Sequence, residues 1–209
     1  MALTPFMIEL KEKNAVIVGG GRVAERRANT LLNNGASLTV VSPDAEEGIM
    51  QLAEQGKLVW KQKGFAGNDL GHAFLIVVAT DDPAVNESVV KAASPDALIN
   101  HAADSEQGNV QFPSFFRRGH LSISVSTDGA SPMLAAGVKR DLQARYDESY
   151  EAYVDFLYAC RQHLKQQSSL ERSEQRDILR ELLSTAYLNS DNQQKMYDYL
   201  EALTGRSPL

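Results

Sequence analysis

The glycine-rich segment at residues 19–24 is the part of this sequence whose spacing points most directly to chemistry. Gly19, Gly21 and Ala24 fit the pattern G-x-G-x-x-G/A. In this pattern the first glycine allows a tight turn, the second lets a pyrophosphate approach the backbone, and the small third residue lets a helix pack closely on a strand. The start of that helix presents free N–H groups and a positive dipole end to the phosphates. The residues predicted to hold the pyrophosphate are Gly19, Gly20, Gly21, Arg22 and Val23.

The residues around this segment form the context that a dinucleotide motif needs. A short apolar run at residues 14–18 leads into the turn, and a helix is predicted over residues 23–34, with Gly35 suited to its C-terminus. Residues 38–41 predict the next strand. The alternative is a glycine turn that only shapes a corner between strand and helix. The order of strand, turn and helix favours nucleotide binding over that alternative.

Polar residues follow the second predicted strand, where an NAD site has an acidic residue for the adenosine ribose. That position is Ser42 here, and Asp44 follows shortly after it. We expect Asp44 to reach the ribose in place of that residue, and no arginine cluster is present there for the 2′-phosphate of NADP, so we expect NAD as the cofactor. A plain turn with a helix cap is the alternative. We assign Ser42, Pro43 and Asp44 to cofactor binding.

A second polar loop follows the apolar run at residues 74–79. Thr80 and Asp81 begin this loop, and Asp82 with Pro83 predicts the N-cap and first position of another helix. Ligands of parallel sheets bind outside the carboxyl ends of the strands, so this loop should border the nicotinamide. We assign Thr80 and Asp81 to cofactor binding, with simple helix capping as the alternative.

His101 and Asp104 follow the predicted strand at residues 97–100, at the same edge of the sheet. An imidazole and a carboxylate can each take a proton or bind a metal ion. We predict Asp104 as a catalytic residue and His101 with Asp104 as ligands of a divalent metal. Solvated polar residues in a loop are the alternative.

The elements that position these residues alternate between strand and helix through the first half of the chain. This order predicts an α/β fold, a Rossmann-type parallel sheet with helices on both faces. The run at residues 74–79 is continuously apolar, as in a strand buried on both faces. The strands are predicted at residues 14–18, 38–41, 58–60, 74–79 and 97–100. We expect this NAD-binding domain to span residues 1–113.

After this domain the pattern changes. Residues 121–126 alternate apolar and hydroxyl side chains, and Ser131 with Pro132 predicts the start of a helix. This strand and helix are too small to stand alone, and an unpaired strand edge invites a partner. We therefore predict an α+β dimerisation segment at residues 114–146 and a homodimer. The helical patterns that follow predict a helical C-terminal domain at residues 147–209.

The composition of the 209 residues argues against several classes of function. A formal net charge of −6 argues against nucleic acid as a partner. No apolar run approaches the roughly 20 residues of a membrane span, and the N-terminus lacks the apolar core of a signal peptide. Cys160 is the only cysteine, so a reducing cytoplasm is the expected location. Its place in a helical pattern predicts a buried thiol and not a nucleophile.

Several further motifs occur along the chain in a fixed order. They are Thr4-Pro5-Phe6, Gly19-Gly20-Gly21-Arg22-Val23-Ala24-Glu25-Arg26-Arg27, Ala79-Thr80-Asp81-Asp82 with Asn86, Ile99-Asn100, Phe112-Pro113 and Ser126-Thr127-Asp128-Gly129-Ala130-Ser131-Pro132. Together these motifs resemble the precorrin-2 dehydrogenase family, which includes the dehydrogenase and ferrochelatase portion of sirohaem synthases. The resemblance covers about residues 1–145, and the helical tail is similar to the family's third domain.

The resemblance implies NAD-dependent oxidation of precorrin-2 to sirohydrochlorin, on the route to sirohaem, and it leaves open whether the product also feeds cobalamin. It implies a homodimer whose central segments intertwine. It also implies a substrate rich in carboxylates, which arginines and helix N-termini bind well. Arg117, Ser124 and Ser131 are therefore expected to bind the substrate.

One departure from the family pattern concerns its catalytic aspartate. Counting back from Pro113 places that aspartate on Ala103, and a shift of one residue places it on Asp104. The departure weakens the prediction of a sirohydrochlorin ferrochelatase activity more than that of the dehydrogenase activity. The reason is that hydride transfer relies mainly on cofactor placement. Two other interpretations stay open, namely an NAD-sensing regulatory Rossmann module and a dehydrogenase for an unrelated small substrate.

Overall fold

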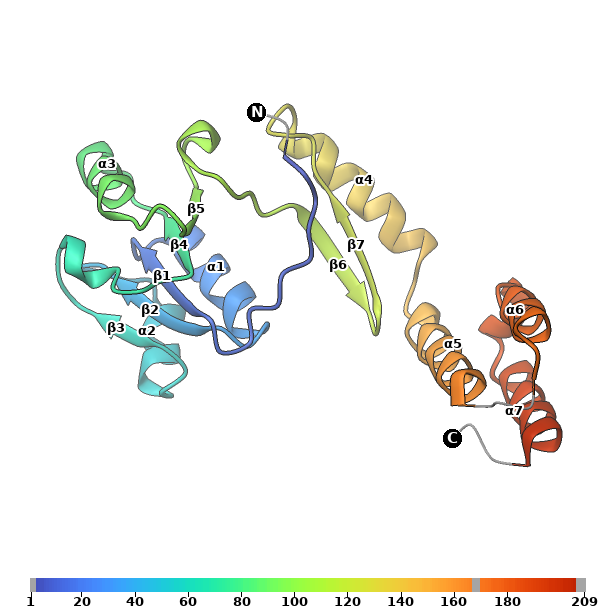
Figure 1. Cartoon of the computed structure of the whole chain (residues 1–209). Coiled ribbons are helices and arrows are strands. Elements are labelled where there is room, and N and C mark those ends of the chain that lie inside the picture. The colour runs from blue at the N-terminus through green and yellow to red at the C-terminus, as the bar shows by residue number, and fades with distance from the viewer. Residues whose placement is uncertain (1–2, 167–169, 206–209) are drawn as a thin grey trace. The chain divides into compact units, whose positions relative to one another are not determined.

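The computed structural model describes residues 3–166 and 170–205 of the chain. The chain forms two compact units, Met1–Phe112 and Pro113–Leu209 (Figure 1). The first unit contains every residue predicted to bind the cofactor. The further division of the second unit into residues 114–146 and 147–209 remains a prediction.

The first unit contains a five-stranded parallel sheet in the order β3-β2-β1-β4-β5 (Figure 1). Its strands are β1 (Asn14–Val18), β2 (Ser37–Val41), β3 (Val59–Lys61), β4 (Leu75–Val78) and β5 (Leu98–His101). Its helices are α1 (Arg22–Leu32), α2 (Glu47–Glu54) and α3 (Pro83–Ala92), with the short 3-10 helices η1 (Gly67–Asp69) and η2 (Ser105–Gln107). The predicted Rossmann-type fold is confirmed.

Successive side chains of a strand point to opposite faces of the sheet, and in this sheet both faces are buried. Ile17 of β1 packs in one core together with Leu31 of α1 and Ile49 of α2. Val18, its neighbour in β1, packs in the other core with Val89 of α3. Helices therefore cover both faces, and the loops that follow the strands are left at one edge of the sheet.

The second unit begins with a β-hairpin. β6 (Ser114–Arg118) pairs antiparallel with β7 (Leu121–Val125), and Gly119 and His120 form the loop. The strand expected at residues 121–126 is β7, and β6, which was not predicted, pairs with it. Gly119 has a φ of +52°, which glycine adopts without strain. A glycine in a two-residue loop is the signal that predicts such a hairpin.

Helices make up the rest of the second unit. They are α4 (Pro132–Arg145), α5 (Ser149–Gln166), α6 (Arg172–Glu181) and α7 (Ser190–Thr204), with the 3-10 helix η3 (Thr185–Leu188). Phe156, Cys160 and Leu200 belong to their shared core. Cys160 is buried, as predicted, and burial raises the pKa of its thiol to about 12. Across the described ranges, no helix has the length and apolar character needed to cross a membrane.

Candidate cofactor and active site

The glycine turn between β1 and α1 is enclosed by two neighbouring loops at its first two positions. Gly19 has a φ of +121°, and a Cβ there would lie 2.3 Å from the carbonyl oxygen of Ala79. A Cβ on Gly20 would lie 2.0 Å from the carbonyl oxygen of Asp44. The backbone N–H of Glu46 also donates to the Gly20 carbonyl at 2.8 Å. Glycine is therefore required at both positions, because the loops after β2 and β4 meet the turn.

Gly21 differs from these two glycines because its surroundings are open. Apart from its chain neighbours, no heavy atom lies within 4 Å of a Cβ built on Gly21. Gly21 is the N-cap of α1, and it has no side chain that could satisfy the first N–H groups of the helix. Ala24 is fully buried, so α1 can approach the sheet closely. These features fit the diphosphate of a dinucleotide, and its binding by residues 19–23 remains a prediction.

Ser42 is buried, and its backbone is tied to β3 on both sides. Its N–H donates to the carbonyl of Lys61 at 3.2 Å. Its carbonyl accepts a hydrogen bond from Nε1 of Trp60 at 3.1 Å. Pro43 and Asp44 follow as exposed residues. The end of β3 therefore lies directly beside the loop where the adenosine ribose is expected, and ribose binding by this loop remains a prediction.

The loop after β4 is held by α3. Oγ1 of Thr80 donates to Oδ1 of Asn86 at 2.8 Å, and Nδ2 of Asn86 donates to the Thr80 carbonyl at 3.1 Å. The carboxylate of Asp82 accepts two backbone N–H groups at the start of α3, which confirms the predicted N-cap. Asp81 is exposed. These bonds fix the loop beside Gly19, so the predicted nicotinamide end adjoins the glycine turn.

Asp104 is the N-cap of η2, and its carboxylate already accepts hydrogen bonds. Nε2 of Gln107 donates to it at 2.9 Å, and so does the backbone N–H of Glu106 at 2.9 Å. The bond from Gln107 and the bond from Glu106 hold the pKa of Asp104 below its usual value. The carboxylate is therefore charged at neutral pH and is a weaker base than a free aspartate. Its catalytic role remains a prediction.

The adjoining His101 is buried, and its two ring nitrogens have different surroundings. Nδ1 accepts a hydrogen bond from the backbone N–H of Asp104 at 2.9 Å, so the hydrogen of the neutral ring lies on Nε2. Nε2 is buried and has no hydrogen-bond partner. A metal ligand needs a free lone pair, which neither nitrogen offers in this arrangement. Within residues 3–166 and 170–205, no three His, Cys, Asp or Glu side chains are grouped to hold a metal ion. The donor set therefore does not fit the predicted metal site.

The predicted substrate residues lie in the second unit. Arg117 of β6 and Ser124 of β7 are exposed, and the strand register places both on one face of the hairpin because it pairs Arg117 with Ser122 and Phe115 with Ser124. The hydroxyl of Ser131 accepts a backbone N–H of the first turn of α4 at 3.2 Å, so Ser131 is the predicted helix cap. Contact of these residues with a substrate remains a prediction.

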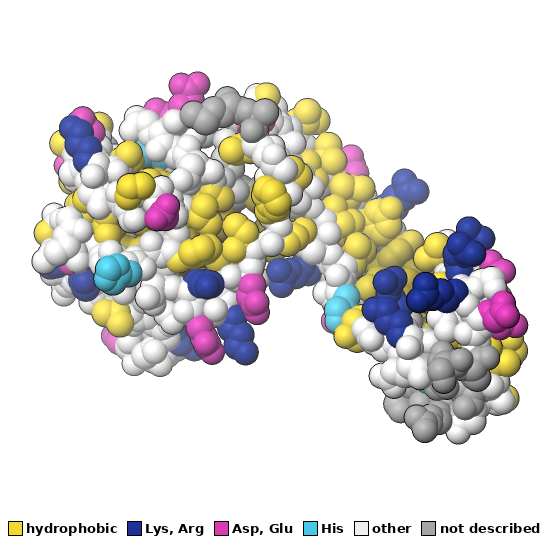
Figure 2. All heavy atoms as spheres, viewed as in Figure 1, with side chains coloured by type: hydrophobic (Ala, Val, Ile, Leu, Met, Phe, Trp, Pro, Cys, Tyr) yellow, Lys and Arg dark blue, Asp and Glu magenta, His cyan; other side chains and the backbone are white. Residues whose placement is uncertain are grey.

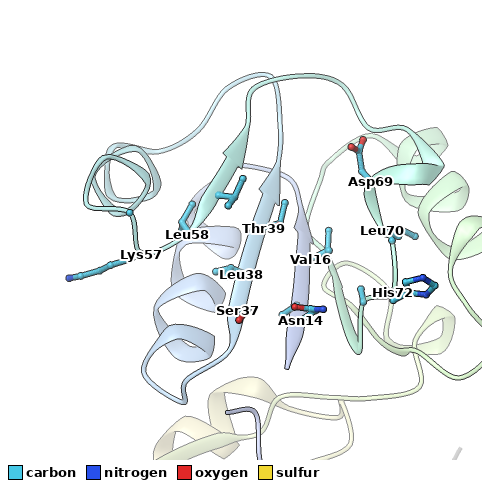
Figure 3. Close-up of a pocket in the computed structure, with 15 residues that line it drawn as sticks. Asn14, Val16, Ser37, Leu38, Thr39, Lys57, Leu58, Asp69, Leu70 and His72 are labelled. Atoms are coloured by element: carbon cyan, nitrogen blue, oxygen red, sulfur yellow. The ribbon is translucent and has the colours of Figure 1, made fainter. Parts of the chain in front are cut away.

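Lys61, the last residue of β3, forms a charged cluster with Lys63 and Asp69 of the loop that follows. The carboxylate of Asp69 is paired with the ammonium groups of Lys61 and Lys63. Asp69 also lines a pocket of about 410 Å³ on the sheet (Figure 3). No motif marks these residues, because the loop between β3 and β4 that brings them together has no sequence pattern of its own.

Three family models match the chain. They are described as putative NAD(P)-binding over residues 6–114, sirohaem biosynthesis protein central over residues 118–145, and SirC C-terminal domain over residues 150–196. The first match supports a nicotinamide cofactor, in agreement with the glycine turn, and it does not distinguish NAD from NADP.

Similar proteins extend over both units. The precorrin-2 dehydrogenase of Priestia megaterium is 41% identical over 181 residues, which cover 87% of this chain and 89% of that protein. The precorrin-2 dehydrogenase of Bacillus subtilis (strain 168) is 40% identical over 159 residues, which cover 76% of this chain and 98% of that protein. A solved structure of SirC, a precorrin-2 dehydrogenase, superposes with a TM-score of 0.84 at 38% identity and covers 96% of this chain and 100% of that chain. The resemblance in the motifs is thus confirmed, and the sensing module is not favoured. The chain belongs to the precorrin-2 dehydrogenase family.

Proposed function

We propose that this chain catalyses the NAD-dependent oxidation of precorrin-2 to sirohydrochlorin, a step of sirohaem synthesis. The observation that carries the proposal is the open space at Gly21, at the N-terminus of α1 and between the loops that follow β2 and β4. This geometry suits a dinucleotide diphosphate, in a chain whose relatives are named precorrin-2 dehydrogenase. NAD is favoured over NADP because no arginine follows Ser42 in the loop before α2.

In this reaction the residues of the chain position the cofactor and the substrate. Dehydrogenation removes a hydride and a proton from the substrate, and NAD would supply the hydride acceptor when bound. The N-terminus of α1 would hold its diphosphate, and the loop at Thr80 and Asp81 would border its nicotinamide. Asp104 receives the proton or orients the macrocycle. Its lowered pKa keeps it in the charged form that both roles require.

The substrate brings many carboxylate groups, which need cations and N–H donors. Arg117 and Ser124 share one exposed face of the β6–β7 hairpin. The start of α4 at Ser131 adds the positive end of a helix dipole. We assign these three residues to the carboxylates of precorrin-2, because a guanidinium pairs with a carboxylate through two parallel hydrogen bonds.

The proposal includes a homodimer formed through residues 114–146. On α4 the side chains of Met133 and Leu134 are 86% and 58% exposed. Figure 2 shows hydrophobic side chains gathered over this helix. A second copy of the chain would cover these side chains and remove their apolar surface from water. The helices of residues 147–209 form a separate C-terminal domain in this proposal.

Two further assignments follow from single residues. Metal insertion is left out of the proposed activity, because the buried Nε2–H of His101 does not fit a metal ligand. The proposed location is the cytoplasm, because its reducing conditions suit the free and buried Cys160.

The test of the proposed function is an anaerobic reaction of purified protein with precorrin-2 and NAD. The expected result is conversion of the macrocycle spectrum to that of sirohydrochlorin, with one NADH formed for each precorrin-2 consumed. A sample without protein corrects for spontaneous oxidation. Tight NAD binding without any turnover would instead support the sensing module.

A further inference from the structure

The end of β3 lies beside the place where the adenosine ribose is expected. Lys61 is the last residue of β3 and pairs in register with Val41, the last residue of β2. Ser42 follows Val41, and its backbone N–H donates to the Lys61 carbonyl. The N–H of Lys63 donates to the same carbonyl at 2.9 Å. The 2′-phosphate of NADP binds just after the second strand of such sheets. The backbones of Lys61 and Lys63 therefore lie next to the position that such a phosphate would take.

Both lysines are already paired with one carboxylate. Nζ of Lys61 lies 3.1 Å from Oδ1 of Asp69, and Nζ of Lys63 lies 2.5 Å from Oδ2. The backbone N–H of Ala66 donates to Oδ2 at 2.9 Å. The side chain of Asp69 is only 5% exposed, whereas those of Lys61 and Lys63 are 38% and 45% exposed. The carboxylate is thus fixed in the protein, and the two ammonium groups reach to it from the surface.

Figure 3 shows on which side of the sheet this carboxylate lies. Asp69 is at the end of the pocket toward which the strands point. Asn14 and Ser37, the first residues of β1 and β2, lie at the other end. Asp69 is therefore at the edge where parallel sheets of this kind bind their ligands.

The negative charge of Asp69 reduces the attraction of Lys61 and Lys63 for another anion. Although burial opposes the charge, the bonds from Lys63, Ala66 and Lys61 hold the pKa of Asp69 below its usual value, so it is ionised at neutral pH. A carboxylate at hydrogen-bond distance offsets the attraction of each ammonium group for another anion. A 2′-phosphate would compete with Asp69 for the lysines and be repelled by it, whereas the 2′-hydroxyl of NAD carries no charge.

We propose that Asp69 makes this chain select NAD over NADP by holding Lys61 and Lys63 on its carboxylate. The inference rests on the proposed dinucleotide site at the glycine turn. It assigns discrimination at the ribose 2′ position to a residue of the β3–β4 loop. Asp69 acts through the two lysines and is a specificity residue without a part in hydride transfer.

The test is the variant Asp69→Asn, which removes the charge but keeps the size and an acceptor oxygen for Ala66. Trp60 is the only tryptophan of the chain and bonds to Ser42, so its fluorescence can report cofactor binding at this edge. The ratio of the Kd for NADP to the Kd for NAD is expected to fall by about tenfold or more in the variant. Adding Lys61→Gln and Lys63→Gln should reverse the gain, because the released cations cause it.

Lys57→Gln is the matched control. Lys57 lines the same pocket but precedes β3, so the same charge is removed at the far end of the strand and the ratio should not change. If Asp69→Asn fails to fold, the same ratio of Kd values is measured in Lys63→Gln, in the otherwise unchanged chain. The ratio should stay within about threefold of wild type, because Lys63 is not available to NADP. A loss of NADP binding of about tenfold or more would show that Lys63 binds the phosphate and overturn the inference.

The remaining outcomes separate this inference from the function on which it rests. An unchanged ratio in folded Asp69→Asn that still binds NAD overturns the inference alone. Equal affinity of the wild type for NAD and NADP also overturns the inference alone. A wild type that binds neither cofactor overturns the proposed function, and the inference with it.

Discussion

The backbone N–H of Asp104 donates to Nδ1 of His101 across 2.9 Å, and this bond decides which ring nitrogen carries the hydrogen. Nε2 is left as a buried donor without a partner. The same loop therefore offers a charged carboxylate, which can take up a proton, and a buried N–H. It does not offer two lone pairs to a metal ion.

Asp104→Ala is expected to slow the single-turnover oxidation of precorrin-2 by about a hundredfold, because it removes the proposed proton acceptor. Asp104→Asn is the matched variant, since its oxygen can still accept from Glu106 and cap η2. Equal losses in both variants indicate a base, and recovery in Asp104→Asn indicates a positioning residue. Wild-type rates in both variants would contradict any role of Asp104 in the reaction.

Gly21→Asp is expected to weaken NAD binding by at least about tenfold, or about 1.4 kcal/mol, because a negative side chain would enter the space for the pyrophosphate. The fold should be unaffected, since no heavy atom beyond the chain neighbours lies within 4 Å of the new Cβ. Titration of purified variants with NAD measures the effect. Gly64→Asp is the control, because its Cβ also meets open space and Gly64 lies outside the turn. Unchanged affinity in folded Gly21→Asp would refute the pyrophosphate site.

The first unit could be predicted from the sequence because its signals are local. The apolar run before the glycine turn and the run at residues 74–79 both form strands of the sheet, β1 and β4. The caps at Asp82 and Ser131 were also predictable, because each is a short polar side chain before a proline. β6 escaped the prediction, because Phe115 and Phe116 break the alternation of apolar and polar side chains that marks a half-buried strand.

Leu134→Glu is expected to convert a dimer into a monomer, because it places a charge on the apolar surface of α4 that a second copy would cover. Light scattering at micromolar concentration should give about twice the 22.9 kDa chain mass for the wild type and the chain mass for the variant. Leu183→Glu is the control, since Leu183 is 68% exposed outside residues 114–146. A wild type that is monomeric under these conditions would rule out the homodimer.

Asp69 is expected to make stability depend on pH. Although burial acts in the opposite direction, the bonds from Lys63, Ala66 and Lys61 lower its folded pKa. Its contribution to the free energy of unfolding is therefore complete above the unfolded value of about 3.9, and it is lost as the pH falls through the lower folded value.

Wild type and Asp69→Asn should accordingly differ in stability by a constant amount between about pH 5 and pH 8, with the difference shrinking below about pH 4. Chemical unfolding followed by the fluorescence of Trp60 measures this difference. A difference that persists unchanged into the acid range would mean that the charge of Asp69 does not contribute to the fold.

The candidate site was less predictable than the fold, because its chemistry depends on contacts between loops. The glycine turn and the polar loops at the ends of the strands could be located from residue spacing alone. The hydrogen on Nε2 of His101 follows from one backbone bond, and no sequence pattern reveals it. The cluster of Lys61, Lys63 and Asp69 likewise forms only when η1 folds back beside β3.

The most direct test of the proposed function is anaerobic single-turnover oxidation of precorrin-2 by the wild-type protein in excess, with NAD present. Sirohydrochlorin and NADH are expected to appear together, at equal rates and in equal amounts. Gly21→Asp is expected to slow the formation of both to the same extent at limiting NAD. Saturable NAD binding by the wild type, with neither product formed above the protein-free control, would contradict the proposed function.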